Sequence, residues 1–368
     1  MTTQFDPDRD ELAALLADQP TYRVEQVWQG LYRDLLDVDA ITTLPRAVRD
    51  RLATEAPPAL RTVTEATSAD AMTVKWLWEL PDGARIETVL MHYDDRSTVC
   101  ISTQAGCAMA CGFCATGQGG FERNLSTGEI VEQVVRASRR ARDADRRVSN
   151  IVLMGMGEPL ANYDRSLDAV HRIHDAIGLS ARHITLSTVG IVPGIRRLAD
   201  EPLPINLAVS LHAADDELRD ELVPINRRYP IADLVAACVH YQQSHNRRLS
   251  FEWALIDGIN DRDEDARRLA DIAHHLRAHV NLIPLNRTPG WPTQGSPARR
   301  VAEFRDLLGS LGVNTTVRAN RGTDIDAACG QLRASVGAGD RQPGSMPTST
   351  VVDGPTRIDR TSGSPATD

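Results

Sequence analysis

Aromatic residues make up only 4% of this chain of 368 residues, and it contains no apolar run of roughly 18 or more residues. A membrane-spanning helix needs such a run, so the sequence predicts none. The acidic first ten residues lack an apolar signal core, which argues against secretion and favours a cytoplasmic protein. In a cytoplasmic chain, six cysteines indicate metal binding or catalysis and not a disulfide framework.

The net charge of −9 argues against a simple nucleic-acid coat protein, yet the charge is unevenly distributed. Acidic residues are frequent in residues 1–60, whereas arginines cluster further along. The largest cluster comprises Arg136, Arg139, Arg140, Arg142, Arg146 and Arg147, and pairs stand at 227–228, 247–248 and 299–300. Phosphate binding depends on local basic patches more than on total charge. The run 136–147 is therefore compatible either with phosphate contacts or with a solvated helix face.

The chain divides into four predicted segments. Residues 1–60 have apolar positions at helical spacing, which predicts a small helical domain of two helices. Residues 61–97 are predicted as a β-hairpin extension around the turn Pro81-Asp82-Gly83. Residues 98–334 form the core. Residues 335–368 hold no aromatic residue and are rich in Gly, Pro, Ser and Thr, so a disordered tail without catalytic role is expected.

Short apolar strands alternate with helical stretches throughout the core. The predicted strands are 98–103, 149–154, 183–188, 205–211, 250–256, 279–285 and 312–317. Repeated βα units predict an α/β fold with a parallel sheet and helices outside it. Six or so such strands would curve into a partial barrel, whose functional residues lie at the C-terminal ends of the strands.

Three cysteines with C-x3-C-x2-C spacing directly follow the first of these strands. Cys107, Cys111 and Cys114 have no fourth cysteine close by, and a structural zinc site usually needs four ligands in paired groups. A 4Fe–4S cluster normally has four Cys ligands, so three would leave one iron free to bind a small molecule. The sequence therefore predicts an open-sided iron–sulfur cluster.

Polar residues follow several other predicted strands. Gly157 and Glu158 belong to the segment Met-Gly-Met-Gly-Glu-Pro, in which glycines let the backbone approach a ligand and the carboxylate could accept bonds from an amino group. Further strand ends carry Ser187, Ser210, Leu211, His212 and Asn286. Their shared position predicts a pocket with hydroxyl, imidazole and amide groups for a ribose and an adenine.

The remaining cysteines stand at three separate places. Cys238 lies within a predicted helix and is interpreted as a buried small apolar residue. Cys100 precedes the triad. Cys329 lies among Gly and Asp residues, which suggests an exposed loop where a thiolate could act as a nucleophile.

These motifs together resemble one family. The triad with Phe113 before its last cysteine resembles the radical S-adenosylmethionine (SAM) superfamily. Over roughly residues 15–334, the chain resembles the bacterial enzymes that methylate adenosine C2 in RNA (RlmN type). The motifs that carry this resemblance are Cys-Ala-Met-Ala-Cys-Gly-Phe-Cys, Gly-Met-Gly-Glu-Pro, Ser-Leu-His, Val-Pro-Ile-Asn and Arg-Gly-Thr-Asp-Ile-Asp-Ala-Ala-Cys-Gly-Gln-Leu. The resemblance implies a partial (βα)6 barrel, a 4Fe–4S cluster, and SAM held by the strand-end residues.

The resemblance also implies a route that uses two SAM molecules. Cys329 first takes a methyl group from one SAM, and a 5′-deoxyadenosyl radical formed from a second SAM removes hydrogen from that methyl group. The resulting methylene radical adds to adenine C2, and Glu87 is the family's candidate for the base that removes the adduct proton. Cys100 then attacks the Cys329 sulfur, so that a disulfide forms and methylated RNA leaves.

The implied partners are 23S rRNA in its peptidyl transferase region, tRNA next to the anticodon, a cytosolic electron donor and a disulfide reductant, with the enzyme a monomer. Three alternatives stay open. The sister activity methylates adenine C8 and confers antibiotic resistance. A protein-modifying activating enzyme would share the cluster but would need no Cys329. A non-enzymatic metal-binding module could grip RNA.

Overall fold

The computed structural model describes residues 2–245, 247, 249–288, 292–318, 321–328 and 330–332. The predicted tail, 335–368, lies outside the described residues, and so does Cys329. Within the described residues, no helix is both long and apolar enough to cross a membrane.

The N-terminal part is helical, as predicted. It contains α1 (Arg9–Leu15), α2 (Tyr22–Tyr32) and α3 (Arg46–Glu55). The Asp8 carboxylate caps α1 by accepting bonds from the backbone of the first turn. Tyr32 is buried and the partly buried Trp28 packs against the same core, so both are structural. The third helix was not predicted, because its Arg- and Asp-rich sequence buries only two residues and gives a weak apolar period.

A ten-stranded sheet follows. Its strands, in spatial order, are β1 (Arg61–Thr67), β2 (Thr73–Glu79), β3 (Arg85–His92), β4 (Ser97–Cys100), β7 (Val148–Leu153), β8 (Ile184–Thr188), β9 (Asn206–Ser210), β10 (Leu249–Leu255), β11 (His279–Pro284) and β12 (Thr315–Val317). The first four are antiparallel, and β4 to β12 run parallel. A separate pair, β5 (Gln104–Gly106) and β6 (Phe121–Asn124), is antiparallel.

The predicted hairpin corresponds to β2 and β3, which pair across the turn at Pro81-Asp82-Gly83. The edge strand β1 was not predicted, because it exposes most of its largely polar side chains and shows no buried face. The predicted α/β class is confirmed, with the short β12 extending the parallel part to seven strands. The domain boundaries at residues 60 and 97 stay predictions.

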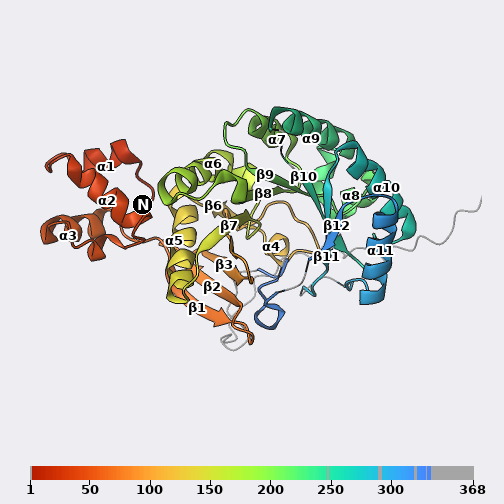
Figure 1. Cartoon of the computed structure of the whole chain (residues 1–368), viewed down its shortest axis with the longest axis horizontal. Helices are drawn as coiled ribbons and strands as arrows, with labels where there is room; N and C mark the ends of the chain where they lie inside the picture. Colours follow the sequence, from red (N-terminus) through yellow and green to blue (C-terminus); the bar gives the residue numbers. More distant parts are fainter. Residues whose placement is uncertain are drawn as a thin grey trace, which may run out of the picture. The chain divides into compact units, whose positions relative to one another are not determined.

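Helices lie on the convex side of the curved sheet (Figure 1). They are α5 (Thr127–Asp143), α6 (Tyr163–Arg172), α7 (Val192–Ala199), α9 (Ile231–His245), α10 (Asp263–His275) and α11 (Ala298–Ser310), with α8 (Asp216–Leu222) following β9. Short 3-10 or π turns occupy Val38–Ala40, Pro159–Asn162, Ile173–Ile177, Ala181–His183, Pro224–Arg227 and Thr323–Ile325. Helix α4 (Ala115–Gln118) lies on the concave side (Figure 1).

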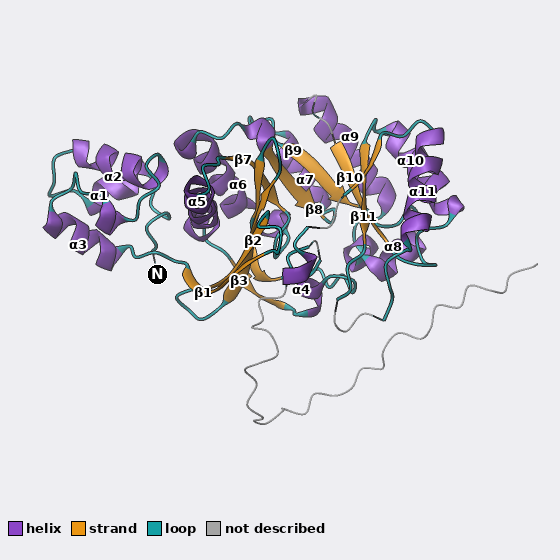
Figure 2. Cartoon of the chain, turned by 60° about the horizontal axis from the view of Figure 1, so that its bottom comes forward, coloured by secondary structure: helices purple, strands orange, loops and turns teal. Residues whose placement is uncertain are grey.

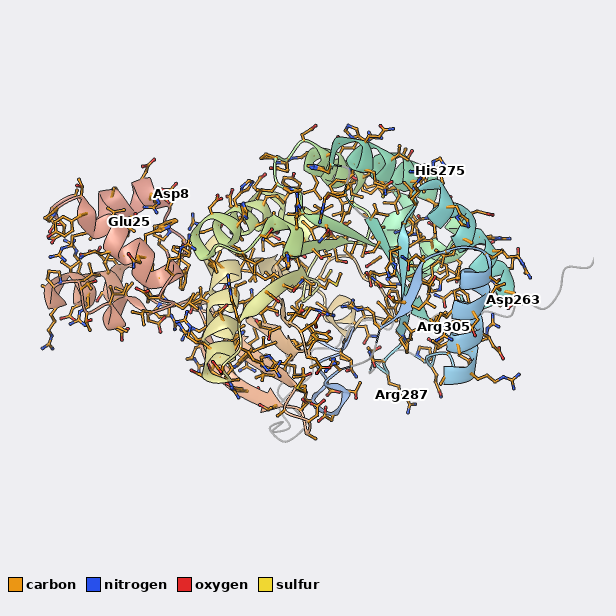
Figure 3. The ribbon with its side chains drawn as sticks, in the orientation of Figure 1. Asp8, Glu25, Asp263, His275, Arg287 and Arg305 are labelled. Carbon is orange, nitrogen blue, oxygen red and sulfur yellow. The ribbon has the colours of Figure 1, made fainter. Side chains whose placement is uncertain are left out.

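The packing of these helices follows from their apolar faces. Helix α5 packs on β7 and α11 on β11 (Figure 2). In α5, Ile130, Val134 and Ala137 are fully buried, which is the i, i+4, i+7 spacing of one helix face. The outer faces carry polar side chains: Asp263, His275 and Arg305 are exposed (Figure 3).

The arginine run 136–147 forms intramolecular contacts. Arg139 donates to both carboxylate oxygens of Asp37, at 2.9 and 3.0 Å, and Arg142 donates to the carbonyl of Asp34 at 3.0 Å. Further contacts join Arg136 to Glu132, Arg140 to Glu65, and Arg146 to the carbonyl of Tyr93. These contacts join α5 to the N-terminal helices and to the sheet, and they favour a structural role over phosphate contacts.

Replacing Asp37 by Asn is expected to lower the free energy of unfolding by about 1–2 kcal/mol at neutral pH. Burial by itself raises the pKa of Asp37, but bonds from Arg139 and Gln4 and the charge of Arg136 lower it overall. A carboxyl with a depressed folded pKa stabilises the protein above its unfolded pKa, and this contribution is lost as pH falls through the folded pKa. Thermal unfolding at pH 7 should therefore separate the two proteins, and the difference should shrink as pH falls through the folded pKa of Asp37. Equal melting temperatures at pH 7 would contradict this role.

Candidate active site

A cavity opens at the C-terminal ends of the parallel strands, where the barrel rule places functional residues. The predicted residues that line it are Cys107, Cys111, Cys114, Gly157, Glu158, Ser187, Ser210 and His212. They come from four separate places in the sequence: after β5, after β7, at the end of β8, and at the end of β9 and just beyond it. The fold therefore brings most of the predicted site together.

The loop that carries the three cysteines is closed at its base by the β5–β6 pair. The Cys107 amide donates to the Gly120 carbonyl at 2.7 Å. A Cβ at Gly106, which has φ +72°, would lie 2.0 Å from that same carbonyl oxygen. The position thus requires glycine, and the loop closes so tightly that its cysteines all face one cavity.

The three thiols fit an iron–sulfur cluster by their chemistry. Burial raises the pKa of Cys107 to about 12 and that of Cys111 well above its usual range, and the neighbouring thiols add to both shifts. A metal centre supplies the positive charge that buried thiolates require, and it releases their protons on binding. Within the described ranges, no three His, Cys, Asp or Glu side chains converge to hold one metal ion. A cluster with several irons does not need such a point, because its cysteines bind separate irons.

The segment after β7 approaches its neighbours closely. A Cβ at Gly155 would lie 2.6 Å from the Ile101 carbonyl oxygen, and one at Gly157, which has φ +102°, would lie 2.6 Å from Gln104 Cβ. Both glycines line the cavity. Their small size lets this backbone form a wall of the cavity while it packs against the start of the cysteine loop.

Glu158 is buried beneath that wall. Its carboxylate accepts bonds from the backbone N–H of Leu160 at 3.0 Å and of Val189 at 2.9 Å. Burial raises the pKa of Glu158 to about 7, and the bonds from Val189, Thr188 and Leu160 oppose the rise. The residue therefore joins the ends of β7 and β8 and places an acceptor at the cavity.

His212 is held in one orientation. Its Nδ1 accepts a bond from the Ala254 N–H at 3.0 Å, and its carbonyl accepts one from Asn260 at 2.8 Å. Burial, with a contribution from Arg219, lowers the pKa of His212 to about 3, so the ring is neutral. Because Nδ1 is an acceptor, the ring proton is on Nε2. The left-handed backbone of His212, with φ +58°, is stabilised by these two bonds.

Leu211 and Asn286 are not among the described residues that line this cavity. Leu211 is fully buried in the core, where its N–H donates to the Glu252 carbonyl. Its position follows from the strand end, at which Ser210 and His212 face the cavity and the residue between them points the other way. Asn286 is 7% exposed and follows β11.

Arg219 supports the site, and sequence reasoning missed it. Its guanidinium is fully buried and donates to the carbonyls of Val189 at 2.6 Å and Leu211 at 3.1 Å. It also donates to Asn226 Oδ1 at 2.7 Å. It therefore fixes two of the strand ends that line the cavity. Its sequence context, Asp-Glu-Leu-Arg-Asp-Glu-Leu, is typical of a solvated helix, and only Asn226 in the Val-Pro-Ile-Asn motif signalled this position.

A second cavity adjoins the first and contains Cys100. The two share the lining residues Cys114, Thr116, Met154, Gly155, Ile283, Arg318 and Gly330. The second is also lined by Val89, Met91 and Tyr93 of the β3 segment and by Ala328. Ala328 and Gly330 are the sequence neighbours of Cys329, which itself lies outside the described residues.

The segments on either side of Cys329 are anchored to different parts of the fold. The Gly330 carbonyl accepts a bond from the Ala115 N–H at 2.8 Å, and the Leu332 carbonyl accepts one from Thr116 at 2.5 Å, so residues 330–332 are joined to α4. On the N-terminal side of Cys329, Asp324 accepts a bond from the Ala69 N–H at 2.9 Å, which connects the segment before Cys329 to the turn between β1 and β2.

Glu87 lies on β3 and lines neither cavity. Sequence alone would place it facing solvent on the hairpin, but it is only 2% exposed. Its carbonyl accepts a bond from Ser102 Oγ at 2.6 Å, and that hydroxyl accepts one from the Met156 N–H at 2.9 Å. The strand of Glu87 is thereby linked to the glycine segment. Val89, two residues on, faces the second cavity from the same side of β3.

Comparisons with known proteins point to one family. Residues 101–270 match the family model of the radical SAM superfamily. A relative from Chloroflexus aurantiacus, described as a probable dual-specificity RNA methyltransferase RlmN, is 52% identical over 89% of this chain and 92% of its own. The dual-specificity RNA methyltransferase RlmN 1 of Myxococcus xanthus is 48% identical over 94% of this chain and 97% of its own.

The fold leads to the same family. The crystal structure of a radical SAM methyltransferase from Sphaerobacter thermophilus matches 91% of this chain and all of that chain, with a TM-score of 0.89 and 50% identity. The chain belongs to the RlmN family of radical SAM RNA methyltransferases.

Proposed function

We propose that this enzyme methylates C2 of adenosine in the peptidyl transferase region of 23S rRNA and in tRNA next to the anticodon, through a methylated Cys329 and two SAM molecules. The observation that carries the proposal is the pair of adjoining cavities. One is lined by three cysteines. The other is lined by Cys100 and by both sequence neighbours of Cys329.

In the proposal, Cys107, Cys111 and Cys114 hold a 4Fe–4S cluster. Gly157, Glu158, Ser187, Ser210, His212 and Asn286 bind the SAM at its open side, and Leu211 orients the two residues beside it. When bound, the cluster and SAM together supply hydrogen abstraction from an unactivated carbon. The Glu158 carboxylate and the neutral His212 offer an acceptor and an Nε2–H donor at this cavity.

The other residues of the proposal handle the methyl group and the RNA. The Cys329 sulfur carries the methyl group, and Glu87 accepts the C2 proton of the adduct. The Cys100 thiolate forms the disulfide with Cys329, and the electron pair of the breaking carbon–sulfur bond goes to carbon, which takes up a proton to complete the methyl group. The one surplus electron of the radical adduct would pass to the bound cluster as electron acceptor. Reaching C2 requires an adenine that is unstacked from its neighbours. The implied electron donor, disulfide reductant, monomeric state and cytoplasmic location are part of the proposal.

Product analysis tests this function. The reconstituted enzyme is incubated anaerobically with SAM, a reductant, and 23S rRNA or tRNA from a strain that lacks the activity, and the digested RNA is examined by mass spectrometry. We expect 2-methyladenosine in both RNAs. Only 8-methyladenosine would establish the sister activity instead, and no methylated base in either RNA would favour a protein-modifying enzyme or a non-enzymatic module.

A further inference from the structure

Lys75 is the only lysine in the chain. The sequence contains 41 Lys and Arg residues, and the other 40 are all Arg, including those on exposed helix faces where either residue would serve. The chain therefore uses Arg wherever a cation is needed, with one exception. An arginine and a lysine differ in shape and bonding, so this exception points to a position where the guanidinium does not fit the task.

The Lys75 side chain is mostly buried and contacts two parts of the structure, Glu87 and the segment before Cys329. It belongs to β2, and its Nζ lies 3.5 Å from Glu87 Oε1 on the neighbouring strand β3. The Lys75 side chain is 15% exposed and that of Glu87 is 3% exposed. A pair this buried is screened less by solvent than a surface pair.

The same ammonium donates to the carbonyl oxygen of Asp326 at 3.2 Å. Asp326 lies three residues before Cys329, and its backbone is left-handed, with φ +52°. A non-glycine residue in this conformation needs support from its surroundings. Lys75 thus stabilises a strained turn in the segment that leads to Cys329.

Two other bonds tie this segment to the β-extension. The Ala69 N–H donates to Asp324 at 2.9 Å, and Arg321 donates to the His92 carbonyl at 3.3 Å. Lys75 differs from both because it contacts Glu87 as well. A tetrahedral ammonium can donate to a carboxylate on one side and a carbonyl on the other, whereas the planar fork of Arg directs its donors within one plane.

We propose that Lys75 is a positioning residue, which holds the carboxyl group of Glu87 at a fixed place relative to the Arg321–Ala328 segment that precedes Cys329. The inference rests on the proposed function, in which Glu87 accepts the proton of the RNA adduct. A base must lie within hydrogen-bond reach of the proton that it removes, so an anchor that connects it to the chain beside Cys329 controls its efficiency.

The single lysine permits a direct test that does not depend on activity. An amine-acylating reagent can modify only Lys75 and the α-amino group of a protein without a lysine-containing tag. Acylation blocks trypsin at Lys75, so residues 62–85 appear as one peptide instead of being cut after 75. In the folded holoenzyme we expect acylation to be about fivefold faster in Glu87→Gln than in the wild type, because the ion pair protects the amine. An equal rate in the two proteins would overturn the pairing.

Activity separates positioning from a merely structural role. In Lys75→Met and Lys75→Arg, we expect Cys329 to be methylated as in the wild type, since the proposed role of Glu87 comes after that step and two other bonds still anchor the segment. Formation of 2-methyladenosine should fall by about 100-fold in both variants. RNA joined covalently to the protein should accumulate, because the adduct proton leaves slowly.

Arg61→Met serves as the matched control, because it removes an exposed cation from the same β-extension. Iron content should equal that of the wild type in all three variants, and the melting temperature should be unchanged in Arg61→Met. Full product formation by Lys75→Met would overturn the inference, and full activity of Lys75→Arg would overturn the need for lysine. A wild-type enzyme that makes no 2-methyladenosine would instead overturn the proposed function, while the acylation result would still report on the pair.

Discussion

Replacement of Cys111 by alanine is expected to leave less than about one iron per chain, against about four in the wild type after anaerobic reconstitution. Cys111 is 6% exposed and lines the same cavity as Cys107 and Cys114, so its loss leaves two thiols there. RNA methylation should fall by more than about 100-fold, since even the outer partners of metal ligands contribute factors of 10 to 100. Iron and sulfide analysis, the visible absorbance and methyl transfer to RNA measure the effect.

Cys238→Ala is the matched control for this variant. Cys238 is fully buried in α9 and is not among the described residues that line either cavity. We expect full iron content and full methylation, with the free energy of unfolding lowered by about 1 kcal/mol for the lost sulfur. A Cys111→Ala protein that binds four irons and methylates RNA would contradict the proposed cluster ligands.

Cys329→Ala is expected to make no methylated RNA while its iron content and SAM binding stay at wild-type levels. In the proposed reaction the Cys329 sulfur carries the methyl group, and alanine offers no atom that could take its place. Trypsin releases residues 322–333 as a peptide with Cys329 as its one cysteine, so mass spectrometry reports directly on this residue. The wild-type peptide should carry one methyl group after incubation with SAM, and the variant peptide none.

The Cys238→Ala protein again supplies the control, since it loses a cysteine but keeps Cys329. The experiment also distinguishes RNA methylation through Cys329 from the activity of a protein-modifying enzyme. A protein-modifying activating enzyme needs no Cys329. Undiminished activity of Cys329→Ala would therefore contradict the proposed reaction through a methylated Cys329 and two SAM molecules. Loss of methylation together with loss of iron would show that the variant had damaged the cluster site instead.

Much of the fold could be predicted from periodicity. The strands β7 to β11 are short apolar runs bounded by polar residues, and the helices between them bury one face, so both patterns are visible in the sequence. The elements that were missed, α3 and β1, lie at the edge of their layers and bury few side chains. Their structure depends on neighbours that are distant in sequence, which a local pattern does not contain.

The cavity residues could be predicted because strand ends and motifs coincide. Eight of the predicted residues line one cavity, since parallel strands end at the same edge of the sheet. The burial of two charged residues, Arg219 and Glu87, could not be predicted. Arg219 has the sequence context of a surface helix and is fully buried, while Glu87 has that of an exposed hairpin and is 2% exposed. Burial of a charged group is decided by what packs on it, and that information is spread over several elements.

The sequence by itself determined the chemistry: three closely spaced thiols, two further cysteines and a glycine–glutamate segment are local features that need no fold to be recognised. Only the tertiary structure decided how these groups are supported. It showed that the arginine run joins α5 to the N-terminal helices, that Arg219 fixes two strand ends, and that Lys75 connects Glu87 to the segment before Cys329. The physical reason is that a charged side chain acts through its partners, and those partners lie up to 251 residues away.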